Sequence, residues 1–92
     1  MKKERVPLET LNLTCGTVVV HQLYGIDMRS ILSMYGGKAS QVDLSEAAAL
    51  RSTTVNGKPL TMDMLDVMPA SDYLEIMGAQ AKNFQSTTAQ DS

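Results

Sequence analysis

Residues 60–84 read LTMDMLDVMPASDYLEIMGAQAKNF and hold the strongest helix signals in the chain. The hydroxyl of Thr61 can accept a hydrogen bond from the free backbone N–H groups of a short helix over 62–67. Pro69 restricts the residue before it to extended backbone and favours a new helix, which we expect to run from Pro69 to about residue 83. This stretch therefore predicts two helices separated by a proline break.

The same stretch is rich in methionine, whose unbranched thioether side chain adapts to irregular apolar surfaces. A chain of 92 residues cannot enclose all of its seven methionines, so we expect an apolar surface on the last two helices that binds another protein. Methionine at helical spacing more often fills a core, and that alternative applies to each residue. The expected protein-binding residues are Met62, Met64, Leu65, Met68, Tyr73, Met77 and Phe84.

The amino-terminal part shows strand patterns. Apolar and polar residues alternate over 8–14, which is typical of a half-buried strand, and β-branched residues dominate 17–23. Cys15-Gly16 lies between the two segments and indicates a turn. We therefore predict an antiparallel hairpin with one face packed on helices, because a lone hairpin is only marginally stable in water.

Two further helices are expected in the middle of the chain. Asp27 is a good N-cap for a short helix over 28–35, which the glycines after it would end. A second helix over 40–52 contains a run of alanines that lets a neighbouring helix approach closely, and either Ser40 or Asp43 could begin it.

The segment 53–59 is expected to be a loop, because it contains the turn pair Asn56-Gly57 and a proline. The fold class is thus α+β, with an N-terminal β-hairpin followed by a small bundle of three to four short helices. We expect a flexible N-terminus over 1–7, one domain over 8–84 and a disordered tail over 85–92.

Charge and composition bound the possible partners. The net charge is −2 and the only basic run, MKKER, is interrupted by Glu4, so no nucleic-acid partner is expected. No apolar run is long enough for a membrane span, and a single cysteine with no apolar leader predicts a cytoplasmic protein. The low aromatic content of 4% implies a modest core, so we expect stabilisation by self-association or a partner.

No constellation of residues supports catalysis. Cys15 and His21 are the only residues of their types and are separated along a strand pattern, which does not predict a catalytic pair. Asp63, Asp66 and Asp72 lie close together in sequence but lack the calcium-loop pattern, and Asp63 and Asp72 suit the first turns of helices. We therefore expect no enzyme activity, no cofactor and no metal site.

The order of these features resembles the tail assembly chaperones of tailed phages and prophages, especially those of contractile-tailed phages. The resemblance covers about residues 8–84, and Met68 stands where the family usually has leucine before the proline. The matching elements are the hairpin, Gly25-Ile26-Asp27-Met28-Arg29, Leu60-Thr61, Leu65-Asp66, Met68-Pro69, Asp72-Tyr73-Leu74 and Phe84.

This resemblance implies a protein of the infected bacterial cytoplasm that binds the long, apolar tape-measure protein, and the modest core leads us to expect a homo-oligomer. Such chaperones keep the tape-measure protein soluble and extended while the tail tube assembles around it. Many occur also in a longer, frameshifted form that contacts the tail tube protein.

Two alternatives from other classes remain open. One is a small structural virion protein, a tail or head-completion component, which would stay in the finished particle. The other is a small transcriptional regulator. That reading would need a basic recognition helix, and the expected helices carry at most one basic residue each.

Overall fold

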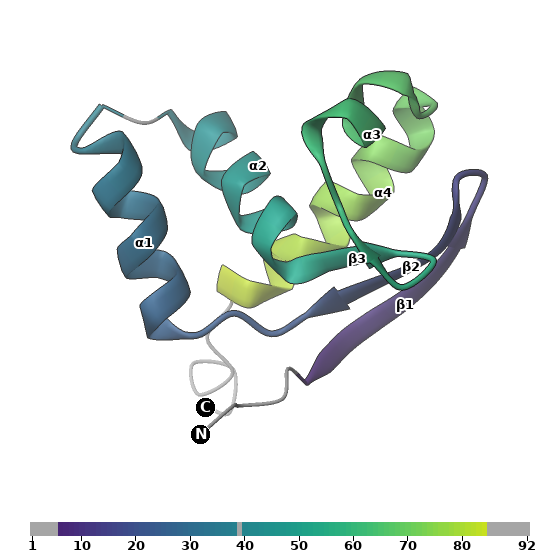
Figure 1. Ribbon diagram of the computed structural model, residues 1–92, viewed down its shortest axis with the longest axis horizontal. Coiled ribbons are helices and arrows are strands. Elements are labelled where there is room, and N and C mark those ends of the chain that lie inside the picture. Colours follow the sequence, from purple (N-terminus) through teal and green to yellow (C-terminus); the bar gives the residue numbers. More distant parts are fainter. Residues whose placement is uncertain (1–5, 39, 85–92) are drawn as a thin grey trace, which may run out of the picture.

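Two β-hairpins form one antiparallel sheet, and the helices lie together on one side of it (Figure 1). The computed structural model describes residues 6–38 and 40–84. The predicted α+β class is confirmed, with the hairpin at the amino-terminal end of the described chain. The expected flexible start and disordered tail fall largely on residues 1–5 and 85–92, which lie outside the described residues.

The first hairpin agrees with the predicted pattern. Strands β1 (Pro7–Leu13) and β2 (Gly16–His21) pair antiparallel, with Leu11 opposite Val18. Val18 and Val20 are fully buried, while Val19 between them is only partly buried. The alternation of apolar and polar residues in the sequence therefore corresponds to one face of the hairpin that points toward the helices.

A second hairpin replaces the loop expected over 53–59. Strand β3 (Thr53–Val55) pairs with β2, and β4 (Lys58–Pro59) pairs with β3. The turn pair was correct: Asn56 and Gly57 both have positive φ, 52° and 85°, as a tight hairpin turn requires. The loop prediction was wrong because strands this short carry no periodicity and are held by pairing with β2.

Helices α1 (Gly25–Tyr35) and α2 (Gln41–Ser52) follow the predicted order. At the start of α2 the Ser40 hydroxyl accepts the Asp43 N–H at 3.1 Å and the Asp43 carboxylate accepts the Ser40 N–H at 3.2 Å. Both residues considered for this start thus take part in one capping box. Helix α1 ends at Gly36, whose φ of 66° suits glycine, as expected.

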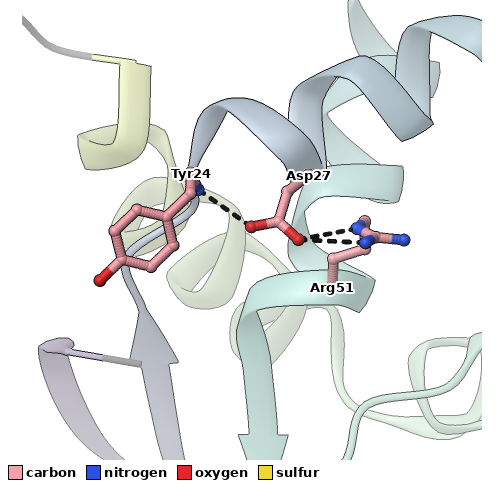
Figure 2. Close-up of polar contacts among 3 residues, drawn as sticks. All are labelled: Tyr24, Asp27 and Arg51. Atoms are coloured by element: carbon pink, nitrogen blue, oxygen red, sulfur yellow. Dashed lines mark hydrogen bonds and ion pairs between the residues drawn. The ribbon is translucent and has the colours of Figure 1, made fainter. Parts of the chain in front are cut away.

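Asp27 has a different role from the predicted N-cap. Helix α1 begins before it, and its carboxylate Oδ2 accepts the Tyr24 N–H at 2.9 Å (Figure 2). Its other oxygen accepts Arg51 Nε at 3.2 Å and Nη2 at 3.0 Å. Asp27 is 1% exposed whereas the Arg51 side chain is 42% exposed. This ion pair therefore fixes the start of α1 to the end of α2.

The last two helices match the expected proline-broken pair. Thr61 caps α3 (Met62–Val67) by accepting the Met64 N–H at 3.2 Å. Pro69 is the N-cap of α4 (Ala70–Gln80), one position outside the expected start. The expected helix to residue 83 divides into α4 and a 3₁₀ turn, η1 (Ala81–Phe84).

The core consists of two clusters, with α2 between α1 and α4 (Figure 1). The smaller cluster joins Ile31 of α1 to the alanines Ala47 and Ala48. Small side chains on α2 let both neighbouring helices approach it closely. The main cluster lies between the sheet and the helices and contains Val18, Val20, Ala49, Val55, Leu60, Leu65, Ile76 and Ala79.

Candidate functional site

An apolar groove of about 490 Å³ lies between α3 and the turn ends of the two hairpins. We call it the α3 groove. It draws on three separate segments of the chain, and its lining residues are Thr14, Cys15, Val55, Asn56, Lys58, Met64, Val67, Met68 and Pro69.

The helical position of each residue explains what α3 presents to the groove. Successive residues of a helix differ by about 100° around the axis, and Leu65 points into the core. Met64, Val67 and Met68 then lie on one side of Leu65 and Met62 on the other. Val67 is 84% exposed, so the groove has an open apolar wall.

One wall of the groove is attached to α4 by a buried carboxylate. Asp72, 3% exposed, accepts the backbone N–H of Cys15 at 3.0 Å. Asp72 also lies in the first turn of α4, as expected from the sequence, where a negative charge is favourable. The bond joins residues 57 apart in sequence and therefore could not be seen from local pattern.

The second wall depends on a close approach between the hairpins. Asn56 Oδ1 accepts the Thr17 N–H at 3.0 Å, and the Asn56 N–H donates to the Thr17 carbonyl at 2.8 Å. Gly16 has a φ of 133°, and a Cβ placed on it would lie 2.5 Å from the Asn56 side chain. Only glycine therefore allows this contact without rearrangement.

The seven expected protein-binding residues do not form one surface. Met64 and Met68 line the α3 groove, whereas Leu65 is 7% exposed and belongs to the core. Tyr73 and Met77 are half-buried and pack against that core.

Met62 and Phe84 are each 47% exposed but do not line the groove. Phe84 follows α4 and η1, which puts it roughly 20 Å from the start of α4. The sequence analysis missed Val67 as a groove residue, although its spacing of three from Met64 placed it on the same side of α3.

Tyr73 has a structural contact that explains its position. Its hydroxyl donates to Glu46 Oε2 at 2.7 Å and so joins α4 to α2. This hydrogen bond raises the pKa of Tyr73 above the ordinary tyrosine value, and desolvation and the negative charge of Glu46 add to the increase.

We expect this contact to make stability fall at alkaline pH. A pKa that is higher in the folded than in the unfolded state stabilises the fold below the unfolded value of about 10, and the stabilisation disappears as pH rises through the folded value. Tyrosinate absorbance and thermal melts from neutral to alkaline pH test it. The tyrosinate absorbance contributed by Tyr73 is the difference between the unchanged chain and Tyr73→Phe, and it should appear above about pH 10. The stability of the variant should fall less than that of the unchanged chain as pH rises. A difference that titrates at or below the ordinary value contradicts the assignment.

Cys15 and His21 are not brought together. Cys15 lies in the turn before β2 and His21 at the end of that strand, roughly 20 Å apart along an extended chain. Desolvation, and then the charge of Asp72, raises the pKa of the Cys15 thiol, which keeps it protonated at neutral pH. His21 Nδ1 lies 3.0 Å from the Ser52 carbonyl, a bond that ties β2 to the end of α2.

Within residues 6–38 and 40–84, no group of three His, Cys, Asp or Glu side chains is placed to hold a metal ion. None of the helices over the same residues has the length and apolar content of a membrane span. Comparison with protein-family models, with curated proteins and with solved structures gives no match to this chain.

Proposed function

We propose that this chain is a phage-type tail assembly chaperone whose α3 groove binds apolar helical segments of the tape-measure protein. One observation carries the proposal. Val67, the most exposed large apolar side chain among the described residues, stands beside Met64 and Met68 in a concave surface. Concave apolar surfaces of this kind accept the apolar stripe of an amphipathic helix. The resemblance of residues 8–84 to the family supports the same partner.

The chemistry of the groove suits a partner whose sequence varies along its length. Methionine side chains repack around different apolar shapes, so one groove can accept successive stretches of a long helix. Burial of apolar surface supplies roughly 25 cal/mol per Å², from which the costs of association are subtracted. Weak, repeated binding of this type would keep an apolar protein soluble and extended in the host cytoplasm until the tail tube covers it.

Co-expression with coiled-coil-rich fragments of a tape-measure protein tests this proposal. We expect a soluble complex with the unchanged chain. Val67→Gln should weaken binding about tenfold, because it puts an amide where an apolar side chain would be buried. Met62→Gln is the matched control: it also puts an amide in place of an exposed apolar side chain, but on the opposite side of α3, and we expect affinity within about twofold.

Both variants should fold, because Met62 and Val67 are exposed. If several fragments stay insoluble with the unchanged chain and no complex can be isolated, the proposed function is wrong. If complexes form but both exchanges weaken them equally, the binding surface lies outside the α3 groove.

A further inference from the structure

The helices of residues 6–38 and 40–84 all lie on one side of the sheet and leave its other face uncovered (Figure 1). Helices pack on the side of Val18, Val20 and Val55, and the residues that alternate with these point the other way. We call this surface the open sheet face. It is formed by Thr10, Asn12, Thr17, Val19, Thr54 and Pro59.

The open sheet face carries no Asp, Glu, Lys or Arg, although charged residues make up 20% of the chain. The strands contain Glu9 and Lys58, but these pair across the sheet with Val20 and Val55 and therefore lie on the helix side. His21 lies at the end of the face, and its Nδ1 is held at the Ser52 carbonyl. A row of uncharged side chains thus runs across the strands, from Thr10 through Val19 to Thr54.

We infer that the open sheet face is a contact between two copies of this chain, which pack sheet against sheet. A two-fold contact brings each patch against an identical patch, so any charge near its centre meets a like charge. An uncharged face avoids this repulsion. An uncharged face also cannot form ion pairs that would recognise a charged partner.

The edges of the sheet favour packing of faces over addition of strands. Strand β1 begins with Pro7, which has no N–H, and its register shifts between Pro7 and Glu9. Glu9 lies on the helix side of β1, where its carboxylate accepts a hydrogen bond from Lys82 Nζ. At the other edge β4 has two residues and ends in Pro59. Proline, irregular pairing and inward charges are the features that prevent strands from adding to an edge.

The size of the face sets the strength of the contact. Strands of seven, six, three and two residues cover on the order of 300 Å² in projection, at about 3.4 Å per residue and 4.8 Å between strands. This is small for a permanent dimer and falls in the class of transient contacts. The dissociation constant is therefore expected between about 10 µM and 1 mM.

Sedimentation equilibrium of the full chain over that concentration range tests the inference. The mass should rise from that of one chain, 10.0 kDa, toward that of two. Thr10→Lys and Thr17→Lys put a charge on the face and should each raise the dissociation constant at least tenfold. Ser33→Lys, at an exposed position of α1, makes the same change in charge on the helix side and should leave association unchanged. Melting curves establish that each variant is folded.

Amide NMR shifts on dilution locate the contact independently of these variants. They should change at Thr10, Val19 and Thr54. A mass that stays at one chain throughout, equal association of Thr10→Lys and Ser33→Lys, or shifts confined to the α3 groove would each overturn the inference. None of these measurements uses the tape-measure protein, so the proposed function is tested separately.

Discussion

Arg51→Met is expected to lower the free energy of unfolding by about 2–3 kcal/mol, because it removes the Arg51 cation from the buried carboxylate of Asp27. Asp27 is 1% exposed and cannot be rehydrated without opening the start of α1. Methionine keeps most of the aliphatic stem of arginine, so the loss of stability measures the effect of removing the charge. The expected loss lies at or below the lower end of the range that is usual for breaking a buried ion pair, because the Arg51 side chain is 42% exposed and partly screened by water.

Thermal melts and urea titrations measure this loss. For a domain of this size it corresponds to a fall in melting temperature of roughly 10 °C or more. Lys82→Met is the matched control, since it also replaces a cation by methionine but breaks an exposed pair with Glu9. It should cost less than about 1 kcal/mol.

A double variant separates the charge from the packing. Asp27→Asn with Arg51→Met removes the buried carboxylate at position 27 together with its Arg51 partner, and an amide oxygen remains to accept the Tyr24 N–H. We expect this double variant to be more stable than Arg51→Met alone. Equal losses for Arg51→Met and Lys82→Met, or a double variant that is less stable than Arg51→Met alone, would show that the ion pair does not hold α1.

Gly16→Ala is expected to destabilise the fold by about 2–4 kcal/mol. The φ of 133° at this position costs an alanine about 1–3 kcal/mol, and its Cβ would lie 2.5 Å from Asn56. The asparagine must then move and lose its bond to the Thr17 N–H, for a further 1 kcal/mol or so. Because Asn56 lines the α3 groove, this variant should also weaken partner binding.

Gly78→Ala is the control of opposite sign. A Cβ there meets nothing within 4 Å, and Gly78 lies inside α4, so alanine should stabilise by up to about 1 kcal/mol. Asn56→Gly combined with Gly16→Ala removes the collision, and glycine accepts the φ of 52° at that turn position. The double variant should therefore recover part of the loss. If Gly16→Ala and Gly78→Ala change stability alike, the close approach of the hairpins is not what requires glycine.

Features set by residues close together in sequence were predicted more accurately than features set by contacts between distant segments. Helix ends set by neighbouring residues were predicted closely, as the caps Ser40 and Thr61 and the end at Gly36 show. Strand β3 was missed because its few residues are ordered by pairing with β2, far away in sequence. Asp27 was placed at the right helix end but in the wrong role, since its carboxylate also binds Arg51 on another helix.

The sequence analysis named two residues of the α3 groove but not its shape. The methionine-rich stretch indicated an apolar surface, and Met64 and Met68 do line the groove. Residue types alone could not show that Leu65 faces inward or that Phe84 lies at the far end of α4. Nor could they show the polar bonds of Asp72 and Asn56, which bring the hairpin turns to α3 across separations of 57 and 39 residues.

Because α1 lies at the periphery of the fold, it should unfold more easily than the sheet. Helix α1 is held mainly by Ile31 among the alanines of α2 and by the Asp27–Arg51 pair, whereas the sheet shares the main core with the other helices. Subglobal unfolding of α1 should therefore need less free energy than denaturation of the whole chain, and its amide hydrogens should exchange with solvent before those of β2. The protein can lose this helix for a moment while the α3 groove and the open sheet face keep their shape.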